Sequence, residues 1–582
     1  MTRPAFSPIP SPARWVRGRP GSGGGHAPAG DLPPKSRVRI REGDQVPLAS
    51  DKAAESPVPA EQEAGHPRRW AILAVMVFSL LAVVLDNTIL NVALRTIADP
   101  VHGLGATQGE LEWAINSYSL VFAGLLFTFG VLGDRNGRKR IMMLGMVIFG
   151  LSSLASAYAQ DPGQLIVARA FMGIGGAAIM PATLAIISNV FPPRERGQAI
   201  GIWAGGVGLA VAIGPVAGGL LLEHFWWGSV FLVNVPVVAI SVVLIALMVP
   251  ESRDPNPARL DPAGVLLSIV GMIALVYGII HGGERGTVLE AGVWGPTLIG
   301  LLVLIIFVVY ESRSDHPAFD VRYFRLPMFS TAVTTLALAF FGMMGVMFLL
   351  AFYFQVVRGY GPLEAGLMML PFAVAQLIFG PLSAGMVQRF GPRVLATVSL
   401  IVVTGTLLAL AFLQADTPVW LVLLISFVQG AAMANIMPPA TTAILQALPR
   451  HKAGVGSAMS NTIRQVGGAL GVAILGSVLA AVYRDEIAPA LAGFPAAVRE
   501  TAGESITATY VLAERAGPQA GALMEAANSA FMDGLRLALI VASAVSLAAT
   551  VIVGRWLPGK AAAEALTPQA QPEATGGEPA RV

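Results

Sequence analysis

The sequence predicts an all-α polytopic membrane protein with fourteen spans. Hydrophobic residues make up 54% of the 582 residues, and only 13% are charged, about half the charged fraction of a soluble domain. The mean hydropathy is +0.67. Apolar runs of 18 or more residues, long enough to cross a bilayer as helices, recur along most of the chain. Lipid is therefore the main solvent that this sequence is built for.

The spans follow one another with short connections, and their even number puts both ends of the chain on one side of the membrane. They are expected at about 70–94, 111–132, 141–160, 164–190, 199–222, 229–249, 263–281, 293–311, 329–357, 364–387, 394–413, 418–446, 462–483 and 530–553.

Lysine and arginine in the short loops orient the spans, because these residues gather on the cytoplasmic side. One side holds fifteen: Arg135, Arg138, Lys139, Arg140, Arg194, Arg196, Arg253, Arg259, Arg313, Arg322, Arg325, Arg389, Arg393, Arg450 and Lys452. The other side holds three: Arg95, Arg285 and Arg358. We therefore expect the first side and both termini to be cytoplasmic.

The two ends differ in composition from the rest. The first sixty-odd residues are rich in Pro, Gly, Ser and Arg without a hydrophobic period, which is typical of disorder. They form either a basic arm that touches anionic lipid, or an inert tail or over-long start. No apolar signal-peptide core precedes Trp70.

A short echo suggests two halves: "DRNGRKR" after the second span resembles "QRFGPR", Gln388–Arg393, after the tenth. The expected parts are a disordered tail 1–67, a six-helix bundle 68–250, two inserted spans 251–312, a second six-helix bundle 313–558 with an outer loop 484–529 that is partly helical, and a disordered tail 559–582. Paired halves with midplane sites are typical of secondary transporters.

Two charged residues lie well inside spans, where charge is rare and indicates function. Asp86 stands in "LAVVLDNTILNVAL" and Arg169 in "LIVARAFMGIGGAAIMPA", and the two reach a similar depth. Asp86 could pair with Arg169 or take up a proton as burial raises the cost of its charge. A group that alternates between these states carries protons; the other interpretation is a permanent ion pair.

"GVLGDRNGRKR", Gly130–Arg140, packs one acid and four bases between two uncharged stretches. The bases contribute to topology, which does not explain Asp134 or the glycines. Gly130 and Gly137 would permit a tight turn, and Asp134 could meet a neighbouring helix N-terminus or an arginine. The stretch is either a passive loop or a cytoplasmic latch that stabilises the outward-open state, formed by Gly130, Asp134, Arg135, Gly137, Arg138 and Lys139.

"AVAIGPVAGGLLLE" combines Pro215 with small residues at helical spacing, Gly214, Gly218 and Gly219. It is either a bendable, close-packed helix that seals against leakage or ordinary small-residue packing. Polar and methionine side chains inside spans are candidates for a substrate cavity, or else for helix–helix contacts: Asn91, Asn116, Gln355, Met347 and Asn461. Met343, Met344, Met368 and Met369 could join an adaptable apolar lining.

Several function classes are excluded. There are no cysteines, which excludes disulfides and thiolate chemistry, and the seven histidines lie in tails, loops or span ends, so no metal or haem is expected. "LPGKAA" lacks the first glycine and the hydroxyl of a phosphate-binding loop. We therefore expect no enzyme, no cofactor and, with a net charge of +3, no nucleic-acid partner.

Together these stretches resemble the major facilitator superfamily, and within it the fourteen-span drug:proton antiporters of the EmrB/QacA type. "GVLGDRNGRKR" is similar to the superfamily's loop signature, "LDNTILNVAL" to the antiporters' first-span motif, "LIVARAFMGIGGA" to the fourth-span motif and "GPVAGG" to the fifth-span motif. The resemblance covers about residues 68–558. It implies two six-helix bundles related by a pseudo-twofold axis, with two extra central helices.

The resemblance implies a proton-coupled exporter of hydrophobic or amphiphilic small molecules in a bacterial cell membrane, with Asp86 and Arg169 coupling protons. Its partners would be substrate, protons and lipid; no residue specifies a periplasmic adaptor. The sequence departs from the family's first-, fourth- and fifth-span motifs at Arg95, Met172 and Ala210, respectively. The thirteenth span has Arg464 but no carboxylate, which disfavours dicationic substrates. The alternatives are a dedicated exporter of one endogenous metabolite and a non-transporting sensor, while "GPVAGG" disfavours an importer.

Overall fold

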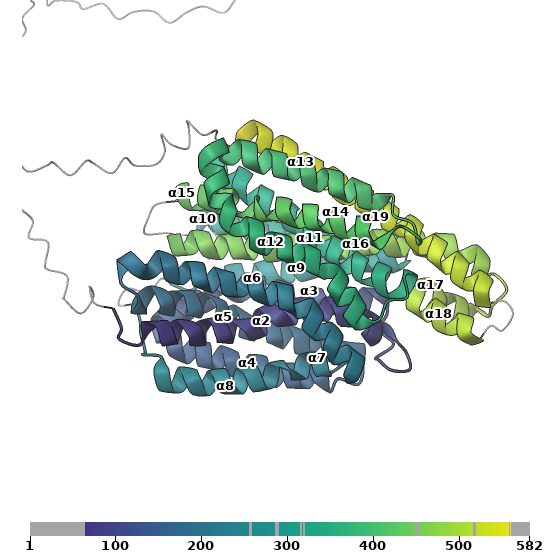
Figure 1. The fold of residues 1–582 in the computed structure, drawn as a ribbon, viewed down its shortest axis with the longest axis horizontal. Helices are drawn as coiled ribbons and strands as arrows, with labels where there is room; N and C mark the ends of the chain where they lie inside the picture. The colour runs from purple at the N-terminus through teal and green to yellow at the C-terminus, as the bar shows by residue number, and fades with distance from the viewer. Residues whose placement is uncertain are drawn as a thin grey trace, which may run out of the picture. The chain divides into compact units, whose positions relative to one another are not determined.

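The computed structural model describes residues 65–254, 259–285, 290–314, 317, 320–448, 453–515, 520–557 and 559. The chain divides into units Met1–Val58 and Pro59–Val582, and every described residue belongs to the second. The predicted tails 1–67 and 559–582 therefore lie almost wholly outside the described residues. The described secondary structure is helical throughout (Figure 1).

The helices before residue 255 are α2 (Arg69–Ala98), α3 (Gln108–Asn136), α4 (Arg138–Ala157), α5 (Pro162–Val190), α6 (Pro193–His224), α7 (Ser229–Leu232) and α8 (Asn234–Met248). The later ones are α9 (Pro262–Arg285), α10 (Ala291–Arg313), η1 (Val321–Arg325), α11 (Pro327–Phe352), η2 (Tyr353–Val357), α12 (Pro362–Phe390), α13 (Pro392–Ala411), α14 (Val419–Ala434), α15 (Met437–Gln446), α16 (Ala453–Leu491), α17 (Ala496–Glu504), α18 (Ile506–Arg515) and α19 (Ala520–Trp556).

Fourteen stretches of the described chain are long and apolar enough to cross a membrane, which confirms the predicted span count and all-α class. The structure adds breaks within spans. The twelfth span divides into α14 and α15 at Asn435, whose side chain donates a hydrogen bond back to the carbonyl of Ala431 at 2.8 Å. The ninth span ends in the π-helical turn η2. The domain boundaries drawn from the sequence stay a prediction.

The region expected as a partly helical loop at 484–529 is helical over most of its described length. α16 continues to Leu491, α17 and α18 follow, and α19 begins at Ala520. The Tyr483 and Thr509 hydroxyls lie 2.7 Å apart, and the Tyr510 hydroxyl donates to Asn528 at 2.8 Å. This extension is therefore tied to both flanking spans (Figure 1).

Two groups of helices follow each other along the chain: the first group is α2–α8 and the later group is α11–α19. Glycines set the close helix contacts within each group. In the first group, a Cβ on Gly173 of α5 would lie 2.6 Å from the Tyr118 carbonyl oxygen of α3. In the later group, a Cβ on Gly430 of α14 would lie 2.3 Å from the Phe372 carbonyl oxygen of α12. At each position the absent side chain lets two backbones touch, as small residues do in membrane helix packing.

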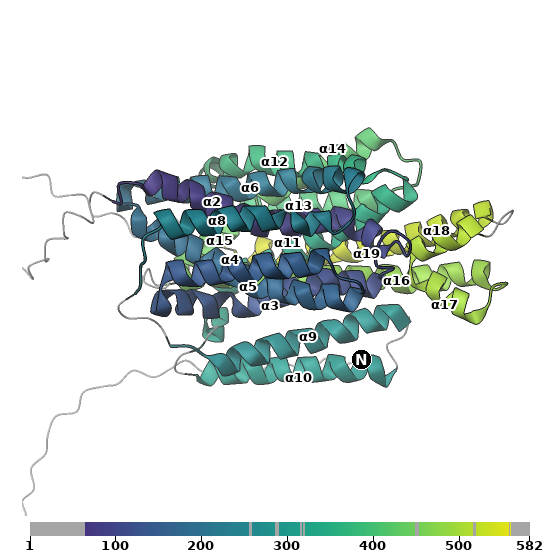
Figure 2. The ribbon, with the colours of Figure 1, turned by 90° about the horizontal axis from the view of Figure 1, so that it is seen from below.

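The pair α9 and α10 lies along one edge of the bundle (Figure 2). α9 contacts α3, since a Cβ on Gly124 would meet Ile269 at 2.3 Å, and it contacts α16, since a Cβ on Gly283 would meet Ser477 at 2.5 Å. The two central spans therefore lie beside the seam between α3 and α16.

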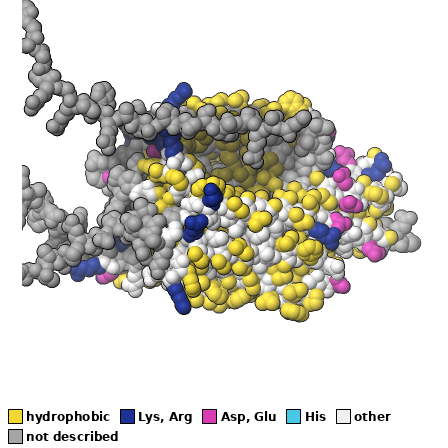
Figure 3. Space-filling view, turned by 90° about the horizontal axis from the view of Figure 1, so that it is seen from above, with side chains coloured by type: hydrophobic (Ala, Val, Ile, Leu, Met, Phe, Trp, Pro, Cys, Tyr) yellow, Lys and Arg dark blue, Asp and Glu magenta, His cyan; other side chains and the backbone are white. Residues whose placement is uncertain are grey.

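The helices end on two sides of the bundle. We call the side with the α3–α4 and α12–α13 connections the basic end, and the other side the opposite end. At the basic end, the His66 amide donates to the Val190 carbonyl at 2.9 Å, and Arg393 donates to the carbonyl of Gly554. Both ends of the described chain therefore lie there, beside loops that carry many of the counted arginines. Between the two ends the visible face is mostly hydrophobic, and it is hollowed near its middle (Figure 3).

The helices of the two groups meet toward the opposite end and part toward the basic end. A Cβ on Gly219 of α6 would lie 2.5 Å from Leu363 Cα of α12, and one on Gly366 of α12 would lie 2.2 Å from the Pro215 carbonyl oxygen of α6. Nearer the basic end, described atoms leave open space around Gly201, Gly205, Gly208, Gly380 and Gly385 of the same two helices. This conformation is closed at the opposite end.

Candidate functional site

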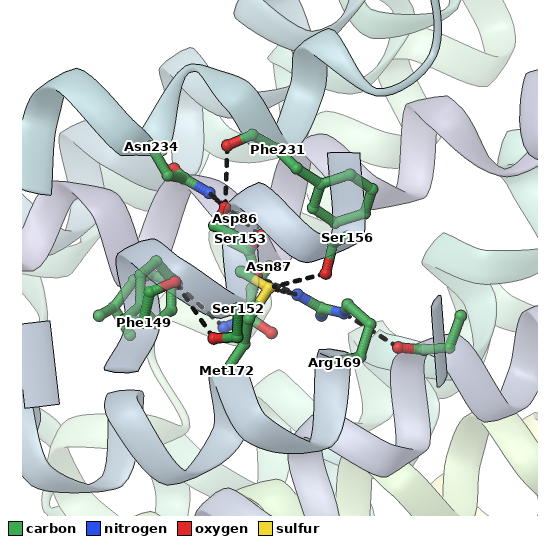
Figure 4. A network of polar contacts seen from close by, with 12 residues as sticks. Asp86, Asn87, Phe149, Ser152, Ser153, Ser156, Arg169, Met172, Phe231 and Asn234 are labelled. Carbon is green, nitrogen blue, oxygen red and sulfur yellow. Dashed lines mark hydrogen bonds and ion pairs between the residues drawn. The ribbon is translucent and has the colours of Figure 1, made fainter. Parts of the chain in front are cut away.

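A buried ion pair joins Asp86 of α2 to Arg169 of α5 (Figure 4). Both side chains are 1% exposed. The Asp161 side chain accepts from the Gln164 amide at 2.9 Å and caps α5, with Pro162 in its first turn. This cap fixes where α5 begins, and Arg169 follows two turns later. The sequence placed the two residues at similar depth, and the structure brings them together.

A second set of groups holds each partner of the pair. Asn234 of α8 donates to Asp86 at 3.3 Å and to the Ser153 hydroxyl at 3.1 Å. Arg169 donates through Nε to the carbonyl of Ala114 at 3.1 Å, and its guanidinium lies 4.6 Å from the centroid of the Tyr118 ring. Four helices besides α2 therefore contribute to the network, namely α3, α4, α5 and α8.

In this arrangement Asp86 can either carry a negative charge or take up one proton. An ionised Asp86 is stabilised by the guanidinium and the Asn234 amide, which act strongly in a buried site. A proton on Asp86 removes its attraction for Arg169. Arg169 then keeps its hydrogen bond to the Ala114 carbonyl and its contact with the Tyr118 ring. Protonation of Asp86 therefore weakens the bonding between α2 and α5 while Arg169 keeps other partners.

The charged stretch 130–140 is more helical than expected. α3 runs to Asn136 and α4 begins at Arg138, so Gly130 lies inside a helix and the expectation that it forms a turn is wrong. Asp134 near the end of α3 pairs with Arg138 at the start of α4 at 2.8 Å, so this ion pair bridges the break between the two helices. Gly137 alone makes the turn, with φ +114°, and a Cβ there would meet Glu251 at 2.6 Å.

The same stretch is bonded to the segment after α8. The Arg138 amide donates to the Ser252 carbonyl at 3.0 Å, and the Asp254 amide donates to the Asp134 carbonyl at 2.9 Å. Lys139 donates through Nζ to the Ala246 carbonyl at 2.8 Å. These contacts stay within the first group of helices. The Arg135 side chain is exposed. The latch role stays a prediction.

The glycines of "GPVAGG" face two different helices. A Cβ on Gly214 would meet Thr88 at 1.8 Å and one on Gly218 would meet Ile89 at 3.0 Å, both on α2, whereas Gly219 faces α12. α6 continues helically through Pro215. This motif therefore packs against the helix that carries Asp86 and forms part of the closed contact with α12.

The cavity candidates fall in different places. The Gln355 side chain donates to the Val92 carbonyl at 2.9 Å, and the backbone carbonyl of Gln355 accepts from the Arg95 side chain. Gln355 therefore joins η2 to α2 at the opposite end. Asn91 donates to the Asn87 carbonyl at 3.1 Å within α2. Asn116 is fully buried, and neither atom of its amide has a hydrogen-bond partner.

Met347 lines a small pocket, and Asn461 pairs with an arginine. Met347 lines a small pocket of about 20 Å³ with Met343, Met368 and Met369, which is about room for one water molecule. Asn461 accepts a hydrogen bond from Arg464. Whether any of the five candidates contacts substrate stays a prediction.

Two residues with a bearing on the site were missed or underused by sequence reasoning. Asn234 was only one polar residue among many, and nothing in the sequence indicates that α8 presents it to Asp86. Glu112 is 1% exposed in α3, and its Oε2 has no hydrogen-bond partner. The rule that singled out Asp86, a carboxylate inside a span, would also have found Glu112. Among the described residues no cluster of three or more His, Cys, Asp or Glu side chains could hold a metal.

The family model of the Major Facilitator Superfamily matches residues 76–472. The chain belongs to this superfamily. Relatives extend the similarity over nearly their whole length. The chain is 34% identical to the multidrug efflux pump LfrA of Mycolicibacterium smegmatis, over 84% of this chain and 96% of that one. It is 32% identical to the tetracenomycin C resistance and export protein of Streptomyces glaucescens, over 85% and 92%.

Another relative is the methyl viologen resistance protein SmvA of Salmonella typhimurium, 34% identical over 84% of this chain and 98% of that one. Among solved structures, a bacterial homologue of the lysosomal transporter Spinster matches with a TM-score of 0.58 and 18% identity, over 85% of this chain and 99% of that one. That similarity shows that the two chains share the fold.

Proposed function

We propose that this protein is a proton-coupled exporter of hydrophobic or amphiphilic small molecules that works by alternating access. Relatives of matching length are named as a multidrug efflux pump and as resistance and export proteins. The observation that carries the proton coupling is the buried pair of Asp86 and Arg169. We place the basic end and both termini in the cytoplasm of a bacterial cell, by the distribution of lysine and arginine.

In this proposal the contact between α6 and α12 closes the outer side while the basic end admits substrate from the cytoplasm. An outside proton on Asp86 loosens its hold on Arg169 and favours the return to this conformation. In this conformation the proton is released inward and the pair re-forms. The carrier then takes up substrate, reopens outward and releases the substrate there. The latch at 130–140 would then stabilise the outward-open state.

The driving force is sufficient without ATP. One proton that crosses 100 mV contributes about 2.3 kcal/mol, and one pH unit adds about 1.4 kcal/mol. The sum, roughly 3.7 kcal/mol, sustains a several-hundredfold gradient of a neutral compound at one-to-one exchange.

The test is substrate uptake into inside-out vesicles under an imposed pH gradient. Asp86→Asn keeps the shape of the side chain and removes the proton, so we expect binding without gradient-driven uptake. Asp533→Asn is the matched control, because Asp533 is 43% exposed and its ion pair, with Arg536 at 3.3 Å, lies away from the buried pair. Equal gradient-driven uptake by Asp86→Asn and wild type would show that Asp86 does not carry the proton.

A dedicated exporter of one endogenous metabolite is the second candidate, favoured by the relative named for tetracenomycin C resistance and export. A growth screen of cells with and without the gene, against structurally unrelated toxic compounds, separates the two. Protection against several classes supports multidrug export, whereas protection against none supports the dedicated exporter.

A further inference from the structure

Arg464 is a cation within a membrane span. Two residues before it, Thr462 bonds to the Ala123 carbonyl about halfway along α3, so Arg464 stands near the middle of the helix bundle. No carboxylate in the described part of the chain lies within ion-pair distance of it. Its guanidinium donates to Asn461 and lies 5.5 Å from the ring centroid of Phe340. Such a charge in a span indicates function.

The packing of α16 determines where Arg464 faces. Toward α3, the Thr462 hydroxyl donates to the Ala123 carbonyl at 3.2 Å. Toward α11, a Cβ on Gly467 would lie 2.3 Å from the Ala337 carbonyl oxygen. On a third side, the Ser477 hydroxyl donates to the Ile279 carbonyl of α9 at 3.0 Å.

At 100° per residue, Arg464 lies on the face of α16 between Gly467 and Gly468, which both meet α11. Asn461 and Gln465 lie between that face and the α3 contact at Thr462. All three side chains are partly exposed although they stand within a span. Arg464 therefore borders the interior between the two groups of helices rather than the lipid.

An adaptable apolar surface lies next to this cation. Phe340, under the guanidinium, stands one helical turn from Met343 and two turns from Met347, which line the methionine pocket with Met368. Met344 reaches α16 itself, because a Cβ on Gly468 would lie 2.8 Å from its Cγ. Methionines repack around differently shaped apolar groups, and arginine binds carboxylates through paired hydrogen bonds.

We propose that Arg464, positioned by Asn461 and Phe340, binds an acidic group of the substrate, a carboxylate or an acidic enol or phenol, while the apolar part of the substrate packs on the methionine surface. The inference rests on the proposed export function and names its substrate class as amphiphilic anions. Asn461 holds the guanidinium when the site is empty and yields it to the ligand.

The test is equilibrium binding, which does not depend on proton coupling. A dansyl-labelled fatty acid, its methyl ester and a dansyl alkyl-trimethylammonium of equal chain length are titrated at pH 8 against the purified protein in lipid nanodiscs, with empty nanodiscs as background. We expect the acid to bind wild type tightest. Arg464→Gln should weaken the acid about tenfold or more, the contribution of a charge-assisted hydrogen bond, and leave the ester within twofold.

Arg464→Lys should recover part of the binding of the acid, because it restores the charge without the paired geometry. Arg536→Gln, at an arginine that is 47% exposed, is the control and should change none of the three. Equal losses for all three probes in Arg464→Gln would assign Arg464 a structural role and overturn the proposal. Wild type that prefers the ester or the ammonium probe would overturn it as well. Failure of gradient-driven uptake with intact binding of the acid would count against the proposed function alone.

Discussion

The contact between α6 and α12 predicts that one added methyl group shifts the conformational equilibrium. In Gly366→Ala the new Cβ would lie 2.2 Å from the Pro215 carbonyl oxygen, against about 3.4 Å for an ordinary contact, so the helices must separate by about 1.2 Å. Overpacking of this kind costs about 1–3 kcal/mol. The cost applies only where the outer halves of α6 and α12 touch, so the outward-open population should rise about 5- to 150-fold.

The absence of cysteine in the sequence makes the assay direct. Gln355 is 1% exposed and donates across the closed end to the Val92 carbonyl of α2, so Gln355→Cys reports whether that end opens. A membrane-impermeant maleimide added to whole cells should label Gln355→Cys slowly alone and at least five times faster when Gly366→Ala is present.

Gly380→Ala is the matched control in the same helix, because no described atom lies within 4 Å of a Cβ there. Both variants gain the same helix propensity, which therefore cancels between them. If Gly366→Ala labels no faster than Gly380→Ala, the outer closure does not depend on this contact and the reasoning is refuted.

Two further predictions concern the stretch 130–140. Asp134→Asn removes the 2.8 Å ion pair with Arg138 and should slow efflux several-fold while equilibrium substrate binding stays within twofold; efflux at the wild-type rate would reduce the stretch to a topological signal. Gly137→Ala forces a side chain to φ +114° within 2.6 Å of Glu251 and should destabilise the protein by about 1–3 kcal/mol, seen as a lower Tm in detergent. Gly133→Ala, whose Cβ would meet nothing closer than 3.9 Å, is the control, and an equal Tm in the two variants would contradict the strain.

The sequence predicted the span count because hydropathy is read directly from composition along the chain. It also placed Asp86 and Arg169 at one depth, since each residue adds a fixed rise to a helix. It could not indicate that Asn234 completes their network, because that depends on how α8 packs across α2. The same limit applied to Gln355, because nothing in the sequence indicates that it bonds to α2 at the opposite end.

Boundaries were less predictable than spans. The helical extension beyond Arg484 is Ala-rich and polar, so hydropathy marks it as loop although its backbone is helical. Gly130 looked like a turn residue because glycine favours turns. The break instead lies seven residues on, at Gly137, whose positive φ interrupts the helix.

The position of α9 and α10 makes the two lateral seams of the molecule unequal. The hairpin covers the seam between α3 and α16, whereas the described chain places no helix over the seam between α6 and α12. Ile202 and Leu209 of α6 and Leu382 of α12 are 46%, 48% and 54% exposed there. A lipophilic compound dissolved in the acyl chains therefore meets a shielded flank on one side and bare helices on the other. For a compound that enters from the bilayer, the described helices leave the α6–α12 flank uncovered.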